Sequence, residues 1–167
     1  MEAIFNRTSI RKYKEKPVEK EKIEKLLRAA MQAPSAANEQ PWEFIVIENK
    51  ETLNKLSGMS PYSKMVAKSA VTFIIVANKD KLKVADAWQQ DLGAATENLL
   101  LEATYLGLGA VWLGTAVSEE NMNFVKKLFK LPENIIPYAV VPVGYPDQNS
   151  TVVDRFNEDS VHYENFK

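Results

Sequence analysis

Apolar residues recur at helical spacing between residues 18 and 31. The positions, at intervals of three, four and seven, are Val18, Ile23, Leu26, Leu27, Ala30 and Met31. Pro17 stands just before this stripe and Pro34 just after it, and proline is well placed at a helix start or beyond its end. The spacing therefore predicts an amphipathic helix across this segment.

A longer helical pattern runs from about residue 85 to residue 106. One face carries Trp88, Leu92, Ala95, Leu99, Ala103 and Leu106, and other faces add Ala94, Leu100 and Leu101. A helix that is apolar nearly all round is buried on several sides, within a core or against a partner subunit. Shorter helical patterns occur over residues 53–58 and 124–129.

Four short apolar runs predict buried strands, over residues 44–47, 71–77, 110–113 and 138–143. Pro142 lies inside the last run, which favours an edge strand or a bulge at that place. From Asp147 the chain is polar but keeps scattered apolar residues, so we expect this tail to lie along a surface. Alternating helices and strands are typical of an α/β or α+β layered domain.

The composition is that of one ordinary globular domain. The chain has 167 residues, of which 46% are apolar and 26% are charged. No linker, repeat or low-complexity tract divides it, so we expect a single domain over residues 1–167. Lys and Arg number 21 against 22 Asp and Glu, a net charge of -1. Because this lacks the positive field of many nucleic-acid-binding proteins, we expect no nucleic-acid partner.

The same pattern bears on location. The apolar runs are far too short to cross a bilayer. The first seven residues include Glu2 and Arg7, where a signal peptide would need a continuous apolar region. We therefore expect a cytoplasmic protein without a membrane partner.

The side chains exclude several kinds of catalytic site. The chain has no cysteine and one histidine, His162, which lies in the polar tail. Thiolate metal sites, disulfides and cysteine nucleophiles are thereby excluded. No group of Asp and Glu has metal-ligand spacing, so we predict no metal, and no Gly-Lys-Ser/Thr phosphate loop occurs. An enzyme of this composition would need a cofactor to carry its chemistry.

Arg7-Thr8-Ser9-Ile10-Arg11 is the first segment with candidate binding chemistry. In an extended chain, residues two apart share a face, so Arg7, Ser9 and Arg11 would present a cation, a hydroxyl and a cation together. Guanidinium groups bind phosphate oxygens in pairs, and a hydroxyl adds a donor. The segment is therefore a candidate phosphate cradle, with a solvated basic stretch as the alternative.

Two further segments could approach a flat ligand. Residues 33–42 place small side chains and the amides of Asn38 and Gln40 between two prolines. Such amides can bind the edge of a heterocycle, although a plain helix-to-strand connection is the alternative. Residues 106–115 carry three glycines, of which Gly107 and Gly109 fit a helix end. Gly114 follows a predicted strand and could offer its backbone N–H to a ligand.

Taken together, these segments resemble the FMN-dependent nitroreductase family. The matching stretches are RTSIRKY at 7–13, PSAANEQPW at 34–42, the helix and glycines at 91–115, PVGYP at 142–146 and DRF at 154–156. They follow in the family's order over nearly the whole chain. The resemblance implies an α+β fold, with a mixed, largely antiparallel sheet flanked by helices, in an intertwined homodimer. The helix over 91–106 would form the dimer contact.

The resemblance also implies a tightly bound FMN at the subunit interface, touched by both chains. By matched position, the phosphate and ribityl end would be held by Arg7, Ser9, Arg11 and Arg155. The isoalloxazine ring would be contacted by Pro34, Ser35, Ala36 and, at its polar edge, Asn38. Lys64 would lie near the N1/O2 edge, and the N–H of Gly114 would face N5. No side chain is assigned as an acid or base.

The implied activity is that of an NAD(P)H-dependent oxidoreductase. NADH or NADPH would supply hydride, and a small-molecule acceptor such as a nitroaromatic or a quinone would be reduced in a second half-reaction at the same site. The segment between Thr115 and the last predicted strand, at 138–143, is too short for a large substrate-covering insertion, which leaves the acceptor open. Two alternatives are a flavin-binding or storage protein and a relative that uses flavin for dehalogenation or flavin breakdown.

Overall fold

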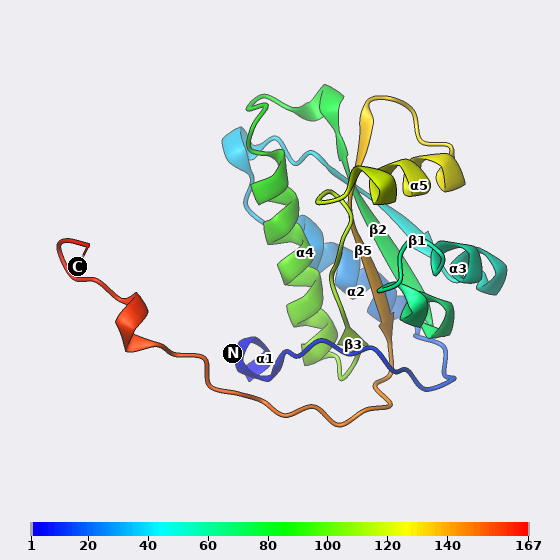
Figure 1. Cartoon of the computed structure of the whole chain (residues 1–167), viewed down its shortest axis with the longest axis horizontal. Helices are drawn as coiled ribbons and strands as arrows, with labels where there is room; N and C mark the ends of the chain where they lie inside the picture. The colour runs from blue at the N-terminus through cyan, green and yellow to red at the C-terminus, as the bar shows by residue number, and fades with distance from the viewer. Residues whose placement is uncertain (1, 167) are drawn as a thin grey trace.

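A computed structural model describes residues 2–166 and places one antiparallel sheet between layers of helices (Figure 1). The α-helices are α1 (Glu2–Asn6), α2 (Lys20–Met31), α3 (Lys50–Leu56), α4 (Trp88–Tyr105) and α5 (Glu119–Phe129). Short 3-10 turns are η1 (Ala36–Asn38), η2 (Lys64–Lys68), η3 (Lys79–Lys81) and η4 (Glu158–Ser160). The strands are β1 (Trp42–Ile47), β2 (Val71–Asn78), β3 (Gly109–Ala110), β4 (Leu113–Gly114) and β5 (Ile135–Gly144).

The strands run in the order β1-β2-β5-β3, and β4 pairs with β5 beside β3. Every pairing of these strands is antiparallel, as between Phe44 and Ile75 or between Phe73 and Val141. The predicted α+β class with a largely antiparallel sheet is therefore confirmed. The predicted third strand, over 110–113, is instead two strands of two residues each, separated by Val111 and Trp112.

The expectation of an edge or a bulge at Pro142 is wrong. Strand β5 is interior, with β2 on one side and β3 and β4 on the other, and the register shift lies opposite Ile75 and Val76. Thr115 donates its N–H to the Tyr138 carbonyl, and N–H directions alternate along a strand. The backbone nitrogen of Pro142 therefore faces the gap between β3 and β4. No strand of residues 2–166 lies there to accept an N–H, so proline costs the sheet no hydrogen bond at this position.

Each face of the sheet has its own core. Helices α2 and α4 cover one face, where Leu26, Leu99 and Phe73 are fully buried. Helices α3 and α5, with η2, cover the other face around Leu56, Ile74 and Val125. Because β2 lies between the two cores, its side chains are buried on both faces, which explains its unbroken apolar run.

The N-terminal segment and the start of the C-terminal tail run close together along one end of the domain (Figure 1). Ile10 and Tyr13 anchor the N-terminal segment in the core. Asp147 donates its N–H to the Lys12 carbonyl, and Thr8 bonds Ser150, so the start of the tail follows this segment. Beyond it the tail leaves the domain, so the predicted surface contact holds only for its first part. Among residues 2–166, no helix has the length and apolar character that crossing a membrane requires.

Candidate functional site

The N-terminal segment lies against strand β3. Ser9 pairs with Ala110 in parallel fashion, and the Ile10 N–H donates to the Ala110 carbonyl at 2.9 Å. Gly109 is therefore not part of the helix end as predicted; it lies under Ile10, where a Cβ would come within 2.6 Å of that side chain. Gly107, with a φ of 71°, takes the left-handed position that ends α4.

The predicted phosphate cradle keeps its cations accessible. Arg7 places Nε 3.6 Å from Oε1 of Glu97 on α4, and its side chain stays 22% exposed. Arg11 is exposed, and Oε1 of Gln148 accepts its backbone N–H at 2.8 Å. Because Ile10 is buried, Ser9 and Arg11 on either side of it face away from the core. Sequence reasoning missed the bracing role of Gln148, because nothing in a polar tail marks one amide among many.

Gly114 has a backbone N–H that its own sheet does not use. Thr115 and Tyr138 form a hydrogen-bonded pair. The preceding pair, Gly114 and Ala139, is then a non-hydrogen-bonded one, whose N–H groups point away from the partner strand. A Cβ at Gly114 would meet only Val117, at an ordinary 3.5 Å. Nothing within the chain requires a glycine here, whereas a ligand close to the backbone would.

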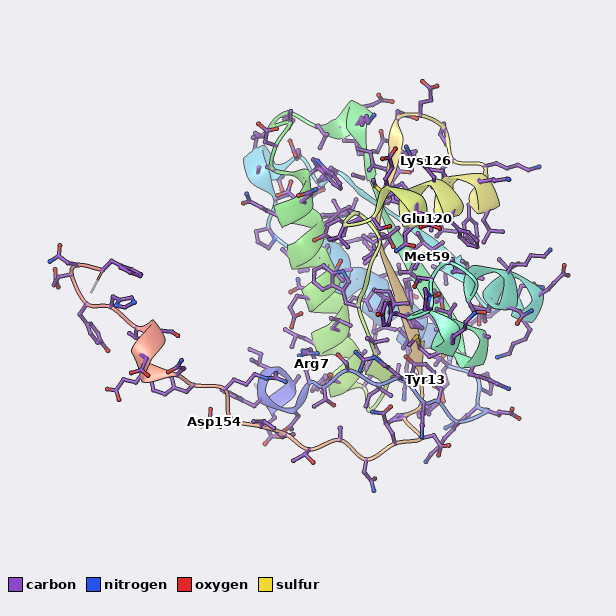
Figure 2. All side chains as sticks on the ribbon, in the orientation of Figure 1. Arg7, Tyr13, Met59, Glu120, Lys126 and Asp154 are labelled. Atoms are coloured by element: carbon purple, nitrogen blue, oxygen red, sulfur yellow. The ribbon has the colours of Figure 1, made fainter. Side chains whose placement is uncertain are left out.

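Lys64 lies in η2, which covers the face of the sheet that α3 and α5 also cover. It is exposed at the start of η2, directly after the buried Ser63. Met59 lies a few residues before Lys64. Its Sδ is 4.0 Å from the hydroxyl of Thr115, the residue after Gly114. Figure 2 shows Met59 between the elements that carry these residues. The segment of Lys64 is thus packed beside β4, where it was expected to share a ligand with Gly114.

The predicted ring-binding loop has a strained backbone. Ala37, Asn38 and Gln40 have φ values of 48°, 49° and 46°, which non-glycine residues rarely adopt. Each such residue costs about 1–3 kcal/mol, and such strain is characteristic of functional sites. The Ser35 hydroxyl accepts the Gln40 N–H at 3.0 Å and closes the loop on itself. Alanine and glutamine do not signal this conformation, so the sequence did not predict it.

Two buried acids attach this loop to the rest of the domain. Asp91, in the first turn of α4, accepts the Ala36 N–H at 2.9 Å. Glu39, within the loop, accepts the N–H groups of Lys83 and Val84 at 2.6 and 2.9 Å. Neither acid was singled out as a site residue from the sequence. Two signals in the sequence could have indicated them. Glu39 is an acid among small residues, and Asp91 is an acid beside apolar positions of a helix predicted to be buried.

Within one chain the predicted ligands form two separate groups. The loop with Pro34, Ser35, Ala36 and Asn38 lies at the start of α4, whereas Ser9 and Arg11 lie beside the strand that follows its end. The fifteen residues from Asp91 to Tyr105 span about 21 Å of helix. The structure therefore brings the cradle near β3 and β4 but does not bring the loop to it.

Arg155 lies on the tail rather than in the cradle. Residues 152–156 face Ile4 and Phe5 of α1 across a hollow of about 440 Å³. This places Arg155 beside the helix that leads into Arg7. A hollow of about 460 Å³, between the loop that follows Tyr13 and η2, contains none of the predicted ligands. Neither of these two hollows outlines the whole predicted site.

Comparison with known proteins identifies the family of this chain. The model of the Nitroreductase family matches residues 4–69 and 59–145. A Methanothermobacter thermautotrophicus protein, provisionally named NADH dehydrogenase/NAD(P)H nitroreductase, is 43% identical over 98% of this chain and 86% of its own length.

Solved structures show the same fold. A Clostridium acetobutylicum protein, provisionally described as an NADH oxidase, is 51% identical with a TM-score of 0.96, over 98% of this chain and 99% of that one. A Desulfovibrio desulfuricans protein, provisionally described as a nitroreductase in complex with FMN, is 30% identical with a TM-score of 0.86, over 99% and 96%. The chain therefore belongs to the nitroreductase family.

Proposed function

We propose that this protein is an FMN-dependent oxidoreductase that takes hydride from NADH or NADPH and reduces a small acceptor, such as a nitroaromatic or a quinone. The two substrates would use one site in turn. The observation that carries the proposal is the free N–H of Gly114, in a chain whose accessible cations lie on the neighbouring N-terminal segment.

The donor set fits a flavin phosphate. A phosphate needs cations and hydroxyl donors, which Arg7, Ser9 and Arg11 supply from one segment. A ring nitrogen that accepts a hydrogen bond needs a donor close to an unhindered backbone, which Gly114 supplies. Arg155 would add a further cation to the phosphate end.

The chain's own groups would bind and orient FMN and would stabilise negative charge on it. Bound FMN would supply hydride acceptance and electron donation, which no side chain of this protein can provide. Lys64 would place positive charge beside the N1/O2 edge and stabilise negative charge there. Pro34, Ser35 and Ala36 would pack against the ring with little side-chain bulk, and Asn38 would bind its polar edge.

The site would be shared by two copies of the chain. In one chain the loop lies at the start of α4, whereas Ser9 and Arg11 lie beside β3, which follows the end of α4, so a partner's loop would complete each site. The tail supports this, because it leaves its own domain with Phe156, Tyr163 and Phe166 at 76%, 81% and 90% exposure. Burying such side chains on a partner would remove a large apolar area from water.

Anaerobic reduction tests the activity. The protein is saturated with FMN, freed of excess flavin and mixed with NADH or NADPH, and the yellow absorption is followed. We expect bleaching by a nicotinamide and recovery on adding a quinone. Bleaching by dithionite alone would contradict the oxidoreductase proposal and favour flavin storage. Failure of the protein to retain FMN would contradict the flavin site itself.

A further inference from the structure

Glu39 and Asp91 form a buried pair of acids that the proposed chemistry does not use. Glu39 is 6% exposed and Asp91 is 5% exposed. One oxygen of each is already bonded: Glu39 Oε2 accepts the N–H groups of Lys83 and Val84, and Asp91 Oδ1 accepts that of Ala36. The pair thus connects the strained loop, the segment before α4 and the first turn of α4.

The remaining oxygens, Oε1 of Glu39 and Oδ2 of Asp91, are buried and accept no N–H or hydroxyl from the rest of residues 2–166. Each acid shifts the pKa of the other, which indicates that the two carboxyl groups lie next to each other. Two carboxylates cannot share a hydrogen bond without a proton, and two adjacent buried negative charges repel strongly. One proton between these two oxygens satisfies both.

Surrounding groups indicate which acid carries that proton. Burial, followed by the hydrogen bond and negative charge of Glu39, raises the pKa of Asp91 above its ordinary value, against the Ala36 N–H. Burial also opposes ionisation of Glu39, but the N–H groups of Val84 and Lys83, the bond from Asp91 and the Lys83 charge together lower its pKa. Asp91 is therefore the donor and Glu39 the acceptor.

We propose that Glu39 and Asp91 are positioning residues, which share one proton and thereby hold the loop of residues 36–40, with Ala37, Asn38 and Gln40 in the left-handed conformation. The loop needs such an anchor, because Ala37, Asn38 and Gln40 are strained. Loss of the proton would leave two like charges in contact, so the loop would move away from α4. The importance of the loop for FMN rests on the proposed function; the shared proton does not.

The pair would be most stable within a pH window. Asp91, with a raised pKa, contributes stability that is lost as pH rises through that pKa. Glu39, with a lowered pKa, contributes stability that is lost as pH falls through its own. Lys83 is the cation that acts on Glu39, and Glu39 is the charged group that acts on Asp91. The loop should therefore loosen at the high-pH end of this window, through ionisation of Asp91.

Substitutions at Asp91 test the shared proton. In Asp91→Asn, the amide oxygen can still accept the Ala36 N–H and the amide nitrogen can donate to Glu39, without a titratable group. Asp91→Ala removes both bonds. Asp86→Asn removes an exposed acid from the segment just before α4 and serves as the matched control. Thermal unfolding of the flavin-free protein is measured from acidic to alkaline pH, together with FMN affinity.

We expect the thermal stability of the wild type and of Asp86→Asn, measured relative to that of Asp91→Asn at the same pH, to fall as pH rises. Asp91→Ala should be less stable throughout and should bind FMN about tenfold more weakly, because fewer molecules hold the competent loop. Equal stability loss in Asp91→Asn and Asp91→Ala, or a wild-type pH profile that Asp91→Asn shares, would overturn the shared proton. If neither the wild type nor any variant binds FMN while the stability pattern holds, the proposed function is contradicted but the shared proton of Glu39 and Asp91 is supported.

Discussion

A Cβ on Gly109 would lie 2.6 Å from the Cβ of Ile10, well inside the closest approach of two carbon atoms. This contact lets the N-terminal segment lie against β3, where Ser9 pairs with Ala110. The predicted phosphate cradle is therefore supported by a glycine that holds no ligand itself.

Gly109→Ala should destabilise the protein by about 1–3 kcal/mol, the cost of overpacking a tight core contact. Ile10 and the N-terminal segment would be pushed away from β3, so proteolysis should reach residues 7–13 sooner. Chemical unfolding and limited proteolysis measure both effects. Gly114→Ala is the control, because its Cβ would meet only Val117 at 3.5 Å. Equal stability of the two variants would contradict the packing described for Gly109.

Removing a cation of the cradle, or the tail cation Arg155, should weaken FMN binding. Arg7→Ala and Arg155→Ala should each raise the dissociation constant, and the loss should shrink as salt screens the charges. Flavin fluorescence titration at low and high salt measures the effect. Arg28→Ala is a matched control, since Arg28 lies exposed on α2 and pairs with Glu24. FMN affinity unchanged in both Arg7→Ala and Arg155→Ala would contradict the phosphate assignment.

The Tyr13 hydroxyl connects the N-terminal segment to the sheet, at 2.7 Å from the Ile10 carbonyl and 3.1 Å from that of Pro142. Tyr13→Phe should cost about 1–2 kcal/mol at neutral pH. Burial raises the pKa of Tyr13 despite the opposing charge of Arg11. The protonated Tyr13 hydroxyl therefore contributes fully to the free energy of unfolding below the ordinary tyrosine pKa of about 10, and this contribution is lost at higher pH.

The stability gap between wild type and Tyr13→Phe should accordingly narrow in alkaline solution. Urea unfolding at neutral and alkaline pH measures it, with Tyr62→Phe as the control because Tyr62 is 81% exposed. A gap that stays constant across this range would contradict the assignment.

Ala37→Gly should leave the fold intact or stabilise it by up to about 1 kcal/mol, because glycine adopts a φ of 48° without strain. The same change at Ala29, inside α2, should instead cost about 1 kcal/mol. Thermal unfolding of both variants compares them. Destabilisation of Ala37→Gly equal to that of Ala29→Gly would show that the loop is not strained.

The elements predicted best are those that use one simple pattern throughout. The apolar stripe over 18–31 became α2, and the continuous apolar run over 71–77 became β2, because burial on one face or on two leaves a periodic trace. The prediction of an edge or a bulge at Pro142 was wrong, because the effect of a proline depends on which neighbouring strand its missing N–H would face. That information lies in the pairing of β5 with two separate short strands.

The site was predictable only in part. The cations and glycines were visible as residue types, and Gly114 was singled out although its free N–H depends on the register with β5. The buried partnership of Glu39 with Asp91 was not visible, because it joins residues 52 positions apart through tertiary packing. The division of predicted ligands between the two ends of α4 likewise appears only in three dimensions.

The central claim is that two copies of this chain form one flavin site from the cradle of one and the loop of the other. Sedimentation of the FMN-loaded protein, followed at both the flavin and the protein absorption bands, tests it most directly. The account predicts that flavin and protein sediment together, as a species with twice the mass of one chain. Flavin that sediments with a single chain, or separately from the protein, would contradict it.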